Sequence, residues 1–313
     1  MKTLTNKLVL SVLALVLTGV ALSVGVFAWF TVNNTASVES FTGTVQTGEG
    51  FYVSLDGQNW VNTISSAEIQ AKINGGNGVT FQALTSTNGK ALTTLDNNPA
   101  GSGTYIDFDL YFVGDGTLGN VEIMSLVLNS GTGTTWQPLV DVPFTRTDGN
   151  ANAILTEYAS NAARVSFTDL IVEPTNAVIF EQNTTTNSNS LGKGSFTSPG
   201  VDADNEAVLY YNHFMGTALT NGQFTAAHPY STTVAGSQNV DVAGLHTQAT
   251  ASTFIGGIAG WNVPASVTNV IGASTYKIGA LKVRVWIEGW DQEALNAILS
   301  GTLDVTLGFA GAI

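Results

Sequence analysis

The stretch TYIDFDLYFVG, residues 104–114, decides the fold class because its side chains alternate between apolar and polar types. Successive side chains of a β-strand point to opposite faces of the sheet. One face therefore carries Ile106, Phe108, Leu110 and Phe112, and the other carries Tyr105, Asp107, Asp109 and Tyr111. A strand with one face in the core and one in solvent is typical of antiparallel sheets.

Other segments repeat this pattern of short apolar runs that end at Gly, Asn or Asp, which predicts further strands. They are residues 50–57, 121–129, 162–172, 276–289 and 302–311. We therefore predict an all-β protein, an antiparallel β-sandwich of the jelly-roll type with a few short helices.

Helical patterns are found at residues 65–75, 151–162 and 291–301. The first has Ser65 or Ser66 as a candidate N-cap and Gly75 as its stop. The third is the strongest, because Asp291 can cap its start and Gly301 can end it in the left-handed conformation. The third is expected to be a short helix that joins two strands.

The region 181–264 differs from the rest of the chain in composition. Residues 181–205 contain few large apolar side chains, and the remainder is rich in Gly, Ala and Thr with weak patterning. Such composition predicts a long, loop-rich insertion. We expect residues 29–313 to form a single elaborated β-sandwich domain that carries this insertion.

The N-terminal segment points to export. From residue 8 to residue 30 the chain runs for 23 residues without a charge, after Lys2 and Lys7. As a helix this run is about 34 Å long, enough to span a membrane, and signal-peptide apolar regions are usually shorter. Its length favours a retained anchor, with the rest of the chain outside the cell.

The local chemistry of the same segment favours a cleaved signal peptide. Val26 and Ala28 occupy the −3 and −1 positions of a cut before Trp29, the pattern that signal peptidases recognise. Residues 1–28 are thus a signal peptide or a membrane anchor. Either way we predict a secreted or cell-surface protein that touches a membrane only through residues 8–30, and only if these are not removed.

Composition excludes several classes of function. Without Lys2 and Lys7 the chain keeps 8 of its 10 basic residues against all 23 acidic ones, a net charge of −15. Phosphate backbones would repel such a surface, so nucleic acid is not an expected partner. The chain has no Cys, which rules out thiol nucleophiles, cysteine zinc sites and disulfides. Only 11% of residues are charged, which is common in exported proteins that assemble.

Four sequence stretches carry a resemblance to a known family: AWFT (28–31), VSLDGQNW (53–60), AARVSF (162–167) and VRVWIEGWDQEALNAILSGTLDVTLGF (283–309). Together they resemble exported bacterial proteins with SipW-type signal peptides, the TasA/camelysin proteins of biofilm matrix. This resemblance implies a jelly-roll β-sandwich and self-association into fibres by donation of the N-terminal strand. The implied assembly strand would begin at Trp29, Phe30 and Thr31 and run through Val38 and Phe41.

Two functions remain open at this stage. The first is an exported structural protein, a subunit of an extracellular filament, biofilm matrix or surface layer. The alternative is a membrane-anchored surface adhesin or glycan-binding module whose tryptophans contact sugar. The candidate tryptophans for that role are Trp60, Trp136, Trp261, Trp286 and Trp290.

No catalytic motif is present, and we predict that the protein is not an enzyme and needs no cofactor. His213, His228 and His246 lie in loop-like sequence without the H-E-x-x-H spacing of a zinc protease, and we interpret them as surface residues. The segment VDADNEA, 201–207, offers a candidate calcium site through its carboxylate and amide oxygens. Its ligands would be Asp202, Asp204, Asn205 and Glu206, and the alternative interpretation is a solvated acidic turn.

Overall fold

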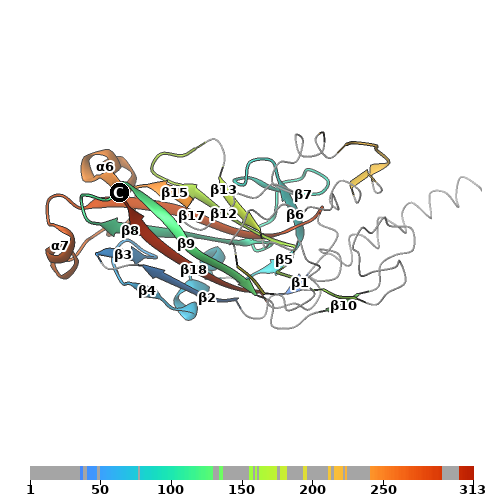
Figure 1. The fold of residues 1–313 in the computed structure, drawn as a ribbon, viewed down its shortest axis with the longest axis horizontal. Coiled ribbons are helices and arrows are strands. Elements are labelled where there is room, and N and C mark those ends of the chain that lie inside the picture. The colour runs from blue at the N-terminus through green and yellow to red at the C-terminus, as the bar shows by residue number, and fades with distance from the viewer. Residues whose placement is uncertain are drawn as a thin grey trace, which may run out of the picture.

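A computed structural model describes the fold. The described residues are 36–37, 41–47, 50–76, 78–129, 134–136, 155–157, 159–160, 162–174, 177–181, 193–195, 211–212, 215–220, 223, 240–290 and 303–313. Within them the protein is mostly β, with few helices, and most neighbouring strands run antiparallel (Figure 1).

The larger sheet has eight strands. They are β3 (Phe51–Ser54), β6 (Ala83–Ser86), β7 (Leu92–Thr94), β8 (Ile106–Gly114), β12 (Ala163–Asp169), β13 (Val178–Glu181), β16 (His246–Thr247) and β17 (Lys277–Glu288). The long strand β17 is the centre of this sheet, because β8, β12, β16 and β6 all pair with it. β13 and β7 end the sheet on opposite sides.

The smaller sheet has six strands. They are β2 (Phe41–Thr47), β4 (Thr63–Ile64), β9 (Asn120–Asn129), β14 (Lys193–Ser195), β15 (Val240–Gly244) and β18 (Leu303–Ala312). β18 pairs antiparallel with β9 and parallel with β2. Two further antiparallel pairs stand apart, β1 (Ala36–Ser37) with β5 (Thr80–Phe81) and β10 (Thr134–Trp136) with β11 (Leu155–Glu157).

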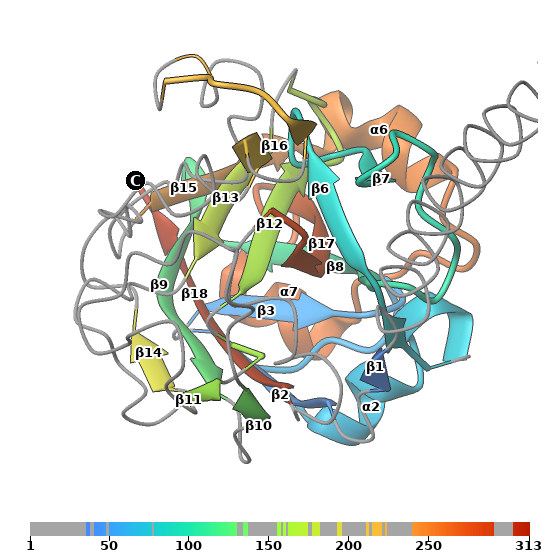
Figure 2. The ribbon, with the colours of Figure 1, turned by 90° about the vertical axis from the view of Figure 1, so that its right-hand side faces the viewer.

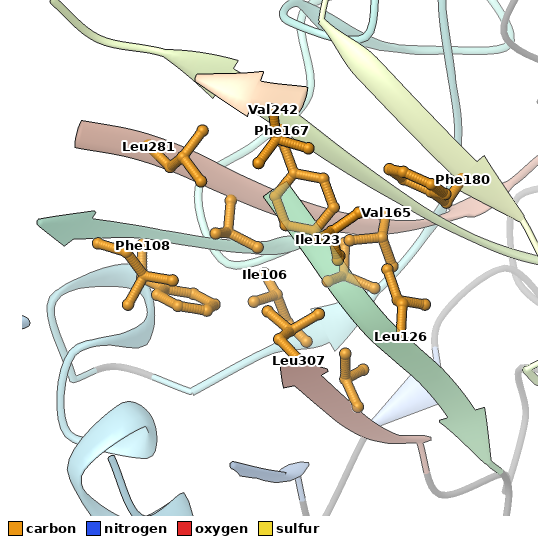
Figure 3. Close-up of a cluster of buried hydrophobic side chains, with 14 of the residues drawn as sticks. Ile106, Phe108, Ile123, Leu126, Val165, Phe167, Phe180, Val242, Leu281 and Leu307 are labelled. Carbon is orange, nitrogen blue, oxygen red and sulfur yellow. The ribbon is translucent and has the colours of Figure 1, made fainter. Parts of the chain in front are cut away.

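One hydrophobic core receives side chains from both sheets. The eight-stranded sheet contributes Ile106, Phe108, Leu110, Phe112, Val165 and Phe167, and the six-stranded sheet contributes Ile123, Leu126, Val305, Leu307 and Phe309. The ring of Phe309 lies 5.2 Å from that of Phe112 and 5.8 Å from that of Phe167, edge to face in both cases. Figure 3 shows such side chains meeting between the strands, and Figure 2 shows β9 and β18 to the left of β12 and β6.

A short helical segment adds to this core. α2 (Ser66–Gln70) begins with a capping box between Ser65 and Glu68, and η1 (Ile73–Gly76) follows it. Each of the two carries one buried isoleucine, Ile69 and Ile73, which packs in the shared core. The predicted helix at 65–75 is confirmed for residues 66–70, and Ser65 is its N-cap.

The outer face of the eight-stranded sheet is covered at two places. α6 (Gln248–Gly256) and α7 (Ala265–Ile271) cover one end, where Trp60, Val113, Ala251, Val267, Ile271 and Ile278 form a second buried cluster. At the other end, Leu84 and Leu92 of β6 and β7 pack with Ile179 and Trp286. Figure 1 shows α6 and α7 at one end of the molecule and β6 and β7 further toward the other.

The structure corrects two of the predictions. Residues 155–157, predicted as part of a helix over 151–162, form strand β11, because β10 offers them a pairing partner that local pattern does not reveal. In the region predicted as loop-rich, residues 248–256 are helical, and β14, β15 and β16 pair with strands of the two sheets. The third predicted helix, 291–301, lies outside the described residues.

Hydrogen bonds connect the turn after β3 to the segment between α6 and α7. Gly57 has φ +71°, and its carbonyl accepts a hydrogen bond from the Asn262 amide at 2.9 Å. The Trp60 indole donates in turn to the Asn262 carbonyl at 2.8 Å. A Cβ added at Gly57 would lie 2.6 Å from Cε3 of Trp261, so this position requires glycine for both conformation and space.

We expect Gly57→Ala to lower the free energy of unfolding by about 2–3 kcal/mol. The strain of an alanine in the left-handed conformation and the clash of its Cβ with Trp261 both destabilise the folded state. Gly50→Ala is the matched control, since its φ is +72° and nothing lies within 4 Å of the added Cβ. That variant should lose only the backbone part, about 1 kcal/mol. Denaturant titration of both variants measures the difference. Equal losses of unfolding free energy in the two variants would show that the clash with Trp261 does not contribute.

Candidate functional site

A groove of about 520 Å³ lies on the outer face of β8, beside the region of η1. The polar residues that line it include Lys72, Tyr105, Asp107, Asp109, Tyr111 and Lys282. Three of these, Asp107, Asp109 and Tyr111, are outward residues of β8, and Tyr105 directly precedes the strand. The same pattern that buries one face of β8 therefore places this polar set on the other.

The floor of the groove is a network of opposite charges across β8 and β17. The register of the two strands places Lys282 opposite Asp109 and Arg284 opposite Asp107. Nζ of Lys282 lies 3.1 Å from Oδ1 of Asp107 and also contacts Asp109, and Nε of Arg284 lies 3.1 Å from Oδ2 of Asp107. Opposite charges that face each other across an antiparallel pair stabilise it. Two carboxylates and two cations balance, so the floor carries no net charge.

The pKa values of Lys282 and Tyr111 are both raised in the groove. Burial by itself would lower the pKa of Lys282, but the hydrogen bonds and charges of Asp109 and Asp107 outweigh it, and that pKa is raised. Burial, together with the charges of Asp109 and Asp56, raises the pKa of Tyr111 to about 12. Lys282 is therefore fully cationic at neutral pH, and Tyr111 keeps its phenol proton and can donate it in a hydrogen bond.

The two tyrosines of the groove stand at its opposite ends. Tyr105 directly precedes β8, and roughly 16 Å of strand run from Ile106 to Tyr111. Tyr111 packs against the cluster under α6 and α7, with its ring 5.8 Å from that of Trp261. Tyr105 packs against the cluster under β6 and β7. Each ring is thus held in place by one of the two coverings of the sheet.

Most of the site residues that the sequence predicts lie outside the described residues. These are the cleavage residues Val26, Ala28 and Trp29, the assembly residues Phe30, Thr31 and Val38, and the calcium candidates Asp202, Asp204, Asn205 and Glu206. Phe41, the last predicted residue of the assembly strand, begins β2 and pairs with Leu303 of its own chain. The cleavage site, assembly strand and calcium site all stay predictions.

The tryptophans do not form a sugar-binding face where the structure describes their side chains. Trp60, Trp286 and Trp290 are 8%, 0% and 3% exposed, and Trp261 is half-buried in the cluster under α6 and α7. The side chain of Trp136 lies outside the described part. This burial excludes Trp60, Trp286 and Trp290 from contact with a glycan.

His246 is half-buried, with its side chain 20% exposed. Its Nε2 lies 3.7 Å from Oδ2 of Asp169, which also accepts a hydrogen bond from the Gly244 amide at 2.9 Å. Oδ1 of Asp169 accepts from the amides of Ile171 and Val172. This carboxylate thereby joins the end of β12 to the end of β15, which is a structural role. His213 and His228 lie outside the described residues.

Local sequence reasoning identified Asp107 and Asp109 as sharing one face, but it missed the groove that they line. The signal that could have found their partners is the alternation in the 276–289 segment, which places Lys282 and Arg284 on one face of a second strand. Only pairing of β8 with β17 brings the two sets together. Lys72 comes from a third, separate segment between α2 and η1.

In the part of the chain that the structure describes, no group of three or more His, Asp or Glu side chains is placed to hold a metal ion. Among those same residues, no helix combines the length and the apolar character needed to cross a membrane.

Comparison with known proteins assigns the chain to no family: no family model matches it, and neither a curated protein nor a solved structure is found to match.

Proposed function

We propose that this protein is an exported structural protein, a subunit of an extracellular filament, biofilm matrix or surface layer. The observation that carries the proposal is the uncharged segment 8–30, which ends in a cleavage pattern and precedes a body with few charges. Further support comes from the rigid β-rich body, whose strands are held by a large shared core. We place the mature protein outside the cell or on its surface.

We further infer that the two sheets form a β-sandwich of the jelly-roll type. The inference is supported by the core that they share and by the aromatic contacts of Phe309 with Phe112 and Phe167. In a sandwich, the inner faces of two sheets interdigitate in this way. The parallel pairs of β2 with β18 and of β6 with β17 depart from a purely antiparallel arrangement.

The proposed mode of assembly is addition of the N-terminal strand to a sheet of a neighbouring subunit. Edge strands present unpaired amide and carbonyl groups that can template another strand. The eight-stranded sheet ends on β13, and no strand among the described residues pairs with its outer side. A second copy of the chain could therefore extend this sheet with its residues near Trp29.

The test compares two purified chains, residues 29–313 and residues 36–313, by electron microscopy and sedimentation. The second lacks Trp29, Phe30 and Thr31 but keeps β1 and β2, so we expect it to fold and remain monomeric while the first forms filaments. Matching circular dichroism and unfolding curves are the control for folding. Filaments from both chains would contradict strand donation. A 29–313 chain that stays monomeric at high concentration, at any pH and with calcium, would contradict the structural role itself.

The start of the native protein distinguishes a free subunit from an anchored one. Intact mass and N-terminal sequencing of the membrane and extracellular fractions should give a mature start at Trp29 in the extracellular fraction. A start at Met1 in the membrane fraction would instead support the alternative, a membrane-anchored surface adhesin.

A further inference from the structure

We propose that the groove on the outer face of β8 is a binding site for a neutral oligosaccharide, with Tyr105 and Tyr111 as its aromatic contacts and with Asp107, Asp109 and Lys282 as its hydrogen-bonding floor. This site does not depend on assembly of the protein into filaments. The lining of the groove includes no tryptophan, although Trp261 and Trp286 pack behind its two tyrosines.

The charges of the floor favour a neutral ligand. Asp107 and Asp109 already pair with Lys282 and Arg284, so on the floor an anion would meet two carboxylates and a cation would meet two basic groups, and the exposed Lys72 adds a single cation to the lining. Binding either kind of ion to the floor would require an existing ion pair to open, which leaves a partly buried charge without its partner. A neutral ligand leaves all of these pairs intact.

The same groups suit a ligand rich in hydroxyls. A carboxylate has about four acceptor positions and an ammonium has three donors, so the pairs in the floor leave hydrogen-bonding capacity on both partners. The Tyr111 phenol adds a further donor. Sugar hydroxyls donate and accept at once, and they can therefore bind acceptors and donors placed side by side. Side chains of Asp107, Asp109 and Lys282 are 22–33% exposed, which leaves them accessible from the groove.

The aromatic groups set the length and the orientation of the ligand. Tyrosines present a large apolar face and a polar tip, which matches the apolar faces and the hydroxyl edges of a sugar ring. Because roughly 16 Å of β8 lie between Tyr105, which directly precedes the strand, and Tyr111, one sugar cannot contact both. An extended oligosaccharide that lies along the strand can reach both rings and cross the charged floor between them.

The groove is also rigid before a ligand arrives. Tyr111 is held by Trp261 and by Phe254, whose ring lies 6.3 Å away, while Tyr105 is held by the cluster of Leu84, Leu92 and Trp286. The floor is fixed by the ladder between β8 and β17. A preformed site loses less conformational entropy on binding, so modest contacts suffice for measurable affinity.

The experiment uses the purified chain 29–313 and an array of neutral oligosaccharides that includes gluco-, manno- and N-acetylglucosamine oligomers of increasing length. Each ligand that binds is then titrated by calorimetry at low and at high salt. We expect affinity to rise with oligomer length and to change little with salt, because no ionic pair forms on binding. The proposal would be overturned if no neutral oligosaccharide on the array bound the protein. It would also be overturned if only charged saccharides bound and their binding were lost at high salt.

Variants locate the binding in the groove. Tyr105→Ala should weaken binding about tenfold, as loss of an aromatic anchor does, whereas Tyr105→Phe should retain it. Tyr276→Ala is the matched control, because Tyr276 is another half-buried tyrosine but lies outside the groove. Ser102→Trp fills the groove from an exposed loop position without touching the core, and it should abolish binding in a chain that unfolds normally. Unchanged affinity in both Tyr105→Ala and Ser102→Trp would overturn the assignment of the site.

Discussion

Replacing Phe309 by alanine is expected to lower the free energy of unfolding by about 3–5 kcal/mol. Phe309 is 2% exposed, and its ring meets Phe112 and Phe167 of the opposite sheet. Its removal therefore takes away buried apolar area and leaves a cavity at the point where the two sheets touch. Chemical denaturation of the chain 29–313, followed by circular dichroism, measures the loss.

Thr306→Ala is the control on the same strand, since Thr306 is only half-buried and faces away from the core. It should cost about 1 kcal/mol or less. A double-mutant cycle with Phe112→Ala then tests the contact between the sheets directly, and we expect a coupling energy of about 0.5–1.5 kcal/mol. Additive losses would contradict a single core between the sheets, and with it the inferred β-sandwich.

The stability of the protein should fall as pH rises from about 4.5 to about 7, because of Glu288. This carboxyl is fully buried at the end of β17, beside Arg164 of β12. Burial raises its pKa to about 7 from the ordinary value of 4.5, although Arg164 and the N–H groups of Trp286 and Trp290 oppose the shift. The folded state therefore holds a proton over a range in which the unfolded state has released it.

A group whose folded pKa is raised contributes stability below its unfolded pKa and loses that contribution as pH rises through the folded pKa. The shift corresponds to about 3 kcal/mol over this window. Glu288→Gln cannot ionise, so it should match the parent at pH 4.5 and exceed its stability at pH 8. Denaturant titrations across that pH range measure both curves.

Glu68→Gln provides the matched control. Glu68 is exposed, and its hydrogen bonds with the side chain and amide of Ser65 lower its pKa, which is the opposite direction. Its contribution is present at neutral pH and is lost only in acid, so this variant should keep the parent's decline between pH 4.5 and 7. A Glu288→Gln variant that declines in parallel with the parent would show that Glu288 is ionised in the folded protein throughout that range.

Local sequence predicted the elements whose cause lies within their own residues. The patterns in 104–114 and in 276–289 predict strands, and β8 and β17 confirm both, although β17 is buried on both faces over most of its length. Ser65, one of the two N-cap candidates in the sequence, begins α2, where it closes a capping box with Glu68 three residues later. Side-chain alternation and capping act over a few residues, so they can be recognised without knowledge of the rest of the fold.

Elements that depend on distant partners were not predictable in this way. Residues 155–157 become a strand because β10 pairs with them, and α6 has a single buried residue, Ala251, in a segment of small side chains. The parallel pairing of β2 with β18 joins opposite ends of the chain. Such choices depend on which surfaces meet after the chain collapses, and local periodicity carries little information about them.

The residues of the candidate site also divide into those that local sequence predicted and those that only the tertiary structure brought together. The local pattern alone placed Asp107 and Asp109 on the outward face of one strand, together with Tyr105 and Tyr111. Tertiary structure supplied their charge partner Lys282, which lies 175 positions from Asp107 along the chain, and the coverings that hold the two tyrosine rings. The direction in which a side chain leaves a strand is a property of that strand, whereas a groove forms only when separate segments pack around it.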